Sequence, residues 1–321
     1  MTRFDRGVAP LAVATRSGYE ESVHHGAAVA LGVDGSVTAA IGDPTLPVYP
    51  RSCLKPLQAG AMVALGLVLP DDQLAVACAS HDGTAPHLDA VRAILDGHGL
   101  TVDHLHNTPA RPYGNPCAPG EPSSLAQNCS GKHAAMLATC VVNGWPTDSY
   151  LEAEHPLQRA ITAWMTERGW RVLHVGVDGC GAPTHVLALD DLARSFAVIA
   201  APGSAVGRVM SAHPVLVGGV DRDVSLVMAT VPGLVAKDGA AGMMAFGLPD
   251  GRSAAFKVAD GSDAARRAVT AQALRELGVD LDEAVVARLR VPVLGHGREV
   301  GHIEPRGWVS TATSGGDPWS S

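Results

Sequence analysis

The order of hydrophobic and polar positions divides the chain into three parts. Two apolar segments, residues 25–33 and 36–42, flank Asp34-Gly35, which is typical of a two-residue hairpin turn. Apolar positions then recur at helical spacing in residues 52–67, 86–97, 131–144 and 149–169. Residues 171–179 and 253–259 resemble strands. Helices are predicted near 190–200, 202–212 and 263–278, and extended chain at 286–305.

This order predicts a mixed α/β fold in which both ends of the chain build one sheet. We expect a single domain over residues 1–321. Its sheet-forming parts are expected at about 1–50 and 171–310, with flanking helices, and an inserted helical lobe at about 51–170. A cleft between a sheet and a helical lobe is a common position for a catalytic site.

Composition narrows the class of protein. The chain has 321 residues, 46% of them hydrophobic, which is enough for a large core. The net charge of -8 and the lack of a basic run argue against nucleic acid or an anionic membrane as a partner. The longest apolar run, residues 59–69, is too short to cross a bilayer, and the first residues lack the form of a secretory signal. We therefore expect a cytoplasmic protein whose six cysteines are free thiols or metal ligands.

Only four of the 24 basic residues are lysines, so each lysine is a candidate for chemistry that needs a neutral amine. Random placement of the four lysines along the chain is the alternative.

Ser52 and Lys55 lie three positions apart, on one face of the helix predicted at 52–67. A buried Lys55 would act as the base for a Ser52 nucleophile. Equally, Ser52 could cap the helix and Lys55 could be solvated.

Two further segments carry groups of the same kind. Ser80, in the sequence SHDG after an apolar run, could present a second hydroxyl, although an Asp-Gly turn explains the sequence equally well. Lys237 ends an apolar segment and is followed closely by Gly239, so it could place an amine in a cleft or lie in a turn. Lys257 is expected to point outward from a strand and to be structural.

The glycine-rich segments at residues 128–136 and 177–185 each carry one cysteine, Cys129 and Cys180. Zinc is the usual ion for two thiolates, so a shared zinc site is one interpretation. The spacing is not that of a zinc finger, and two unconnected thiols are the other interpretation.

Seven segments, taken together and in order, resemble the Rhizobium etli-type L-asparaginases. They are RSG at 16–18, ESVHHG at 21–26, PRSCLKPLQA at 50–59, SHDG at 80–83, CSGKH at 129–133, DGCGAPTH at 178–185 and AKDGAAG at 236–242. The resemblance implies a fold similar to that of serine β-lactamases and glutaminases, and a homodimer. It also implies a zinc cofactor, held by Cys129, Lys132 and Cys180, that is not itself the catalytic acid.

The same resemblance implies two Ser-Lys pairs, Ser52–Lys55 and Ser80–Lys237, and hydrolysis of L-asparagine to L-aspartate and ammonia. We expect Ser52 to be the nucleophile that Lys55 activates, and Ser80 and Lys237 to relay protons. The residues expected to bind the small-molecule substrate or support the zinc site are Arg51, His133 and Asp178. Two alternatives remain: a serine hydrolase of the same fold acting on glutamine or a β-lactam, and a non-catalytic, zinc-containing amino-acid sensor.

Overall fold

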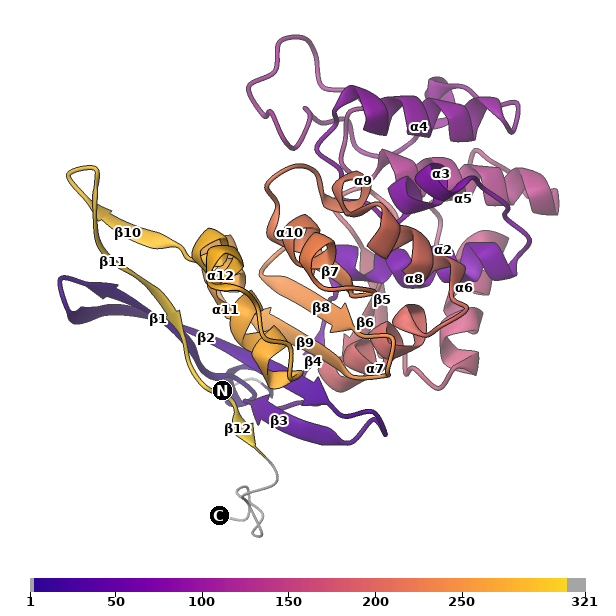
Figure 1. Cartoon of the computed structure of the whole chain (residues 1–321). Helices are drawn as coiled ribbons and strands as arrows, with labels where there is room; N and C mark the ends of the chain where they lie inside the picture. The colour runs from indigo at the N-terminus through magenta and orange to yellow at the C-terminus, as the bar shows by residue number, and fades with distance from the viewer. Residues whose placement is uncertain (1–2, 311–321) are drawn as a thin grey trace.

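The computed structural model describes residues 3–310, and its centre is a large antiparallel sheet with helices on both faces (Figure 1). The strand order is β10-β11-β1-β2-β9-β8-β7, and β3 pairs with both β2 and β12. The strands are β1 (Ala9–Arg16), β2 (Tyr19–Leu31), β3 (Val37–Ile41), β7 (Val235–Gly239), β8 (Met243–Gly247), β9 (Ser253–Val258), β10 (Pro292–Gly295), β11 (Arg298–Pro305) and β12 (Val309–Ser310).

The sheet joins the two ends of the chain. Strand β1 pairs with β11, and β2 pairs with β9, so that Ala28 lies opposite Phe256. Helix α7 (Leu189–Ala200) and helix α11 (Asp263–Glu276) both pack on β8 and β9, and every residue of β7, β8 and β9 is buried. Strands covered on both faces are mostly apolar, and these three are apolar except at Ser253, Lys257, Lys237 and Asp238.

The remaining helices form a lobe beside the sheet and a smaller group around α10 (Figure 1). They are η1 (Arg51–Leu54), α2 (Lys55–Ala64), α3 (Asp71–Ala77), α4 (Ala85–Asp96), η2 (Val102–His104), α5 (Ser130–Asn143), α6 (Pro156–Glu167), α8 (Ala205–Ala212), α9 (Pro214–Gly218), α10 (Asp223–Thr230) and α12 (Glu283–Leu289), with the short α1 (Arg3–Arg6) at the N-terminus. A second sheet has the order β4-β6-β5, from β4 (Pro47–Val48), β5 (His174–Val177) and β6 (Pro183–Ala188).

The mixed α/β class is confirmed, whereas the prediction of one domain over residues 1–321 stays a prediction. The Asp34-Gly35 turn does join β2 to β3, with Gly35 at a φ of 76°. The predicted helix at 149–169 begins only at Pro156, because proline suits the first helical position and the His155 side chain caps the Leu157 amide. Of the helices between residues 3 and 310, none is long and apolar enough for a membrane crossing.

Two other expectations were wrong. Residues 283–289, partly expected to be extended, form α12, whose Leu289 is buried and which packs on α11. Lys257, expected to point outward, is buried in β9. Its Nζ donates to the carbonyl oxygens of Val258 (2.9 Å) and Ala241. Both differences come from tertiary packing that local sequence does not encode.

Candidate active site

The Ser52–Lys55 segment is a tight turn that leads into α2. Arg51 has a φ of 54°, in the left-handed region that non-glycine residues rarely occupy. Pro56 fixes a helical φ directly after Lys55, which suits the first turn of a helix. The turn leaves Ser52 half-buried and directs Lys55 into the interior, where the residue is 1% exposed. Lys55 is therefore not the solvated lysine of the simpler interpretation.

The amine of Lys55 contacts Ser80 rather than Ser52. Lys55 Nζ donates to Ser80 Oγ at 3.1 Å and to the carbonyl oxygens of Ala79 (2.5 Å) and Asn128 (3.4 Å). Within residues 3–310, no hydrogen bond involves the Ser52 hydroxyl. The structure thus brings together one lysine of the first expected pair and the serine of the second.

Lys237 reaches the same hydroxyl from β7. Its Nζ donates to Ser80 Oγ at 2.9 Å, to Asp238 Oδ1 at 2.5 Å and to the Asp238 carbonyl at 2.8 Å. Burial and the nearby Lys55 charge lower the pKa of Lys237, although the Asp238 carboxylate opposes them. Ser80, which is 3% exposed, therefore lies between two buried amines.

The thiol of Cys53 attaches the Ser52–Lys55 turn to strand β7. Its Sγ donates to the Lys237 carbonyl oxygen at 3.0 Å, and burial raises the pKa of this thiol to about 12. Gly239 permits the close approach, because a Cβ there would lie 2.4 Å from the Pro50 carbonyl oxygen. Cys53 is therefore a protonated, structural group that sets the position of Lys237 relative to α2.

Backbone contacts hold the Ser80 segment between two other elements. The Ser80 amide donates to the Val217 carbonyl at 3.0 Å, and the His81 amide donates to the Asn128 carbonyl at 3.2 Å. His81 Nε2 also lies 2.9 Å from Ser130 Oγ, at the start of α5. Asn128 thus links the Lys55 amine to the loop that carries Cys129.

The three expected zinc ligands come together at the start of α5. Cys129 and Cys180 are buried and hydrogen-bonded to each other, and Lys132 Nζ lies 3.2 Å from Cys180 Sγ. The Cys129 hydrogen bond and the Lys132 ammonium lower the pKa of Cys180 despite its burial. Burial by itself would lower the pKa of Lys132. The nearby Cys180, Cys129 and Asp178 side chains have the larger combined effect, so the pKa of Lys132 is raised.

This donor set fits zinc. Two sulfurs and one amine converge, one sulfur already has thiolate character, and zinc prefers sulfur and nitrogen ligands. No group of three His, Cys, Asp or Glu side chains that could hold a metal occurs among residues 3–310, so a zinc site here would need Lys132 as a ligand. A bound ion would displace the Lys132 proton, because only the free amine ligates.

The expected substrate-binding residues lie around this cluster. Arg51 Nε donates to Asp178 Oδ1 at 2.7 Å, and Lys132 and Arg51 lower the pKa of Asp178 against the effect of its burial. His133 Nδ1 lies 2.8 Å from the Tyr150 hydroxyl, and burial keeps the pKa of His133 well below its usual range. His133 Nε2 is buried and has no partner among the described residues.

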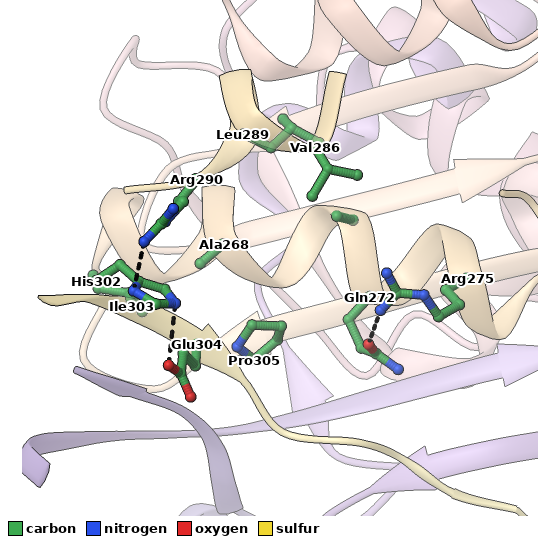
Figure 2. Close-up of a pocket in the computed structure, with 11 residues that line it drawn as sticks. Ala268, Gln272, Arg275, Val286, Leu289, Arg290, His302, Ile303, Glu304 and Pro305 are labelled. Atoms are coloured by element: carbon green, nitrogen blue, oxygen red, sulfur yellow. Dashed lines mark hydrogen bonds and ion pairs between the residues drawn. The ribbon is translucent and has the colours of Figure 1, made fainter. Parts of the chain in front are cut away.

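A separate cavity of about 200 Å³ lies between α11, α12 and β11 and does not contain this cluster (Figure 2). Its walls are mostly apolar, from residues such as Ala268, Leu289 and Ile303. At its rim Arg290 Nη2 lies 3.0 Å from His302 Nδ1, and His302 Nε2 lies 3.1 Å from Glu304 Oε1 (Figure 2). None of the predicted site residues lines it.

Sequence reasoning missed two residues of the site. Asp238, directly after Lys237, could have been noticed as a carboxylate beside a candidate amine. Arg222 has no local signal: it precedes α10 and reaches Asp238 Oδ2 at 2.5 Å. The Lys237, Arg222 and Arg266 cations hold the pKa of Asp238 far below its usual range, although its burial acts in the opposite direction.

The sequence pattern of a family described as L-asparaginase II matches residues 12–305. The structure is similar to a crystal structure of a β-lactamase from Mycobacterium bovis, with 16% identity and a TM-score of 0.36, over 79% of this chain and 95% of that chain. No curated protein sequence gives a significant match.

Proposed function

Because this chain belongs to the L-asparaginase II family, whose members are amidohydrolases, we propose that it hydrolyses L-asparagine to L-aspartate and ammonia through an acyl-enzyme. The observation that carries the proposal is the buried chain Lys55–Ser80–Lys237, in which one hydroxyl accepts hydrogen bonds from two amines at 3.1 and 2.9 Å. Such a chain is suited to accepting and returning protons out of contact with bulk water.

Ser52 is proposed as the nucleophile. It is half-buried, and so closer to solvent than Ser80, which is 3% exposed. It also begins a Ser-x-x-Lys turn, an arrangement that supplies the nucleophile in several serine hydrolases. Among the residues that the structure describes, none forms a hydrogen bond with the Ser52 hydroxyl that would have to be broken before it approaches a substrate.

The proposed first half-reaction forms an ester. The Ser52 oxygen attacks the side-chain amide carbon, and its proton passes to Lys55 as the base. Two ammonium groups that share one hydroxyl repel each other, so a site with one free amine is favoured. The relay through Ser80 then protonates the amide nitrogen, the carbon–nitrogen bond breaks and ammonia leaves. Backbone amides near Ser52 would stabilise the oxyanion, and one such donor is typically worth about 3 kcal/mol of barrier.

The second half-reaction releases the product. Water attacks the ester carbon and gives its proton to the same relay. The bond to Ser52 breaks, Ser52 regains a proton, and aspartate leaves. Arg51 and Asp178 present opposite charges at 2.7 Å from each other, which suits a substrate that carries both a carboxylate and an ammonium group. The neutral His133 supplies a polar group beside them.

Cys129, Lys132 and Cys180 would hold zinc, which when bound would fix the loop that follows residue 128 and add positive charge beside the substrate site. The homodimer, which rests on the resemblance, and the cytoplasmic location, which rests on the sequence composition, are likewise parts of the proposal.

The experiment is a substrate panel on the purified full chain. Ammonia release is measured from L-asparagine and from L-glutamine, ring opening from β-lactams, and thermal stabilisation with each compound. The proposal expects ammonia from L-asparagine with the highest kcat/KM. Faster turnover of glutamine or a β-lactam would assign another substrate. Stabilisation by asparagine with no ammonia would indicate a sensor.

A further inference from the structure

The side chain of Arg222 connects two carboxylates that flank the catalytic cluster. Its Nη2 lies 2.5 Å from Asp238 Oδ2, and its Nη1 lies 3.3 Å from Asp82 Oδ1. The three side chains are only 10–15% exposed, so these are largely desolvated ion pairs. The ring of Tyr113 lies against the same guanidinium, 4.6 Å from its centroid to Arg222 Cζ.

Each carboxylate is a near neighbour in sequence of a catalytic group. Asp238 directly follows Lys237, and its Oδ1 accepts a hydrogen bond from Lys237 Nζ at 2.5 Å. Asp82 lies two residues after Ser80. Arg222 therefore spans the two segments that carry the lysine and the serine. A planar guanidinium can contact two carboxylates at once in a fixed geometry, which a lysine ammonium cannot do equally well.

The surrounding backbone is adapted to this contact. Gly219 has a φ of 102°, and a Cβ there would lie 1.8 Å from Asp82 Oδ2, so a side chain would displace the Asp82 carboxylate. The Gly114 amide donates to the Asp82 carbonyl at 3.0 Å, which places the Tyr113 segment on the same turn. The contact thus links α10, the Ser80 turn, strand β7 and the segment around Tyr113.

We infer that Arg222, together with Asp82 and Asp238, is a positioning unit that holds the Lys237 amine at the Ser80 hydroxyl. Among the described residues, the hydrogen bonds of the Arg222 guanidinium go to Asp82 and Asp238 rather than to Ser80 or Lys237, so Arg222 acts through Asp238. The catalytic consequence of this unit rests on the proposed function, whereas its effect on Lys237 does not.

The charges around Lys237 give the direction of the expected change. The titratable and charged groups that face Lys237 or its partner Asp238 are Lys55, Cys53, Cys78, Asp238, Arg222 and Arg266. Without Arg222, more of the Asp238 charge acts on Lys237 alone, and the ammonium form of Lys237 is stabilised. A displaced Lys237 also loses its alignment with Ser80, and a misplacement of about 1 Å can cost roughly 10²-fold in rate.

The experiment compares Arg222→Lys and Arg222→Met with the wild type. Arg208→Met is the matched control, because Arg208 also pairs with an aspartate, Asp71, but on the exposed surface. The rate is read as kcat and KM for L-asparagine. The amine is read by NMR of ¹³Cε-labelled lysine, which is tractable because the chain has only four lysines. Loss of one resonance in Lys237→Met assigns the signal of Lys237.

We expect kcat to fall by roughly 10²-fold in Arg222→Met and by less in Arg222→Lys, with KM changed by about 3-fold or less. The Lys237 titration midpoint should rise in Arg222→Met, and by less in Arg222→Lys, which keeps a positive charge but not the two-carboxylate geometry, and Arg208→Met should match the wild type. A folded Arg222→Lys with wild-type kcat and an unmoved Lys237 midpoint would overturn the inference, even if its Tm is lower. If Arg222→Met does not fold, Arg222→Lys alone is sufficient to test the inference.

Chemical rescue provides a second readout. Arg222 lines an open groove of about 490 Å³, so free guanidinium can enter the space that Arg222→Ala leaves. Partial recovery of kcat with guanidinium, and none with equal sodium chloride, supports positioning. No recovery together with an unmoved Lys237 midpoint contradicts it. If the wild type releases no ammonia but the midpoint still moves in Arg222→Lys, the proposed function fails and the positioning role stands.

Discussion

Replacing Ser80 with alanine separates catalysis from folding. The change removes one hydroxyl that accepts from Lys55 at 3.1 Å and from Lys237 at 2.9 Å. Both amines keep other acceptors: Lys55 keeps two carbonyl oxygens, and Lys237 keeps both oxygens of Asp238 that it contacts. We therefore expect the free energy of unfolding to fall by only about 1–3 kcal/mol, the range for lost hydrogen bonds to charged groups.

The expected loss of rate is larger. A positioned proton donor or acceptor typically contributes about 10²–10⁴-fold, which corresponds to roughly 3–5 kcal/mol of barrier. The assay measures kcat for ammonia release and, on the same sample, urea unfolding and the intact mass after rapid acid quench. Ser80→Ala should be folded, slowed at least about 10²-fold, and should carry an aspartyl group on Ser52.

Two results would refute this reasoning. A kcat within a few-fold of the wild type would mean that Ser80 is not part of the proton relay. An aspartyl group found on Ser80 in a Ser52→Ala variant would reverse the roles of the two serines. Ser36→Ala is the control, because Ser36 is an exposed residue between β2 and β3 whose hydroxyl donates to Asp34 Oδ1 at 2.6 Å.

Three further predictions concern the metal, pH and backbone. Cys180→Ser should abolish zinc binding, measured by elemental analysis. It should also lower Tm, because a ligand at 100 times its Kd adds about 2.7 kcal/mol to the free energy of unfolding. A full zinc complement in that variant would contradict the ligand assignment. In the folded state, burial lowers the pKa of His87 below its ordinary value of 6.5. The unfolded chain therefore binds more protons in acid than the folded chain does. The free energy of unfolding should fall by up to about 1 kcal/mol between pH 6.5 and pH 5.5. His87→Gln should remove that part of the slope in urea titrations at both pH values, and an unchanged slope would count against it. Gly219→Ala should lower both stability and kcat, because its Cβ collides with Asp82, whereas Gly203→Ala, with a similar φ of 93° and open space, should cost stability only.

Local periodicity predicted the elements that carry the site better than the site itself. The helices α5 and α11 lie where helical spacing predicted them, and each has a defined end, at Gly144 after α5 and at the Ser262 cap before α11. Helix α12 was not expected, because its short sequence becomes helical through packing on α11. Boundaries such as the start of α6 depend on a single cap and a proline.

The pairing of the proposed catalytic groups could not be read from spacing. Ser52 and Lys55 are close in sequence, yet the Lys55 amine turns toward Ser80, 25 positions away. That choice is set by the Ala79 and Asn128 carbonyl oxygens, which are brought there by tertiary structure. The resemblance to a family did name both serines and both lysines, but it named neither Asp238 nor Arg222.

The most direct test of the central claim is ammonia release from L-asparagine by the wild type and by Ser52→Ala, with fold and zinc content measured on the same samples. The account predicts release by the wild type and, from a folded Ser52→Ala that retains zinc, a rate reduced at least about 10³-fold. Undiminished release from that variant would contradict Ser52 as the nucleophile. No release from a folded, zinc-bearing wild type would contradict the proposed substrate.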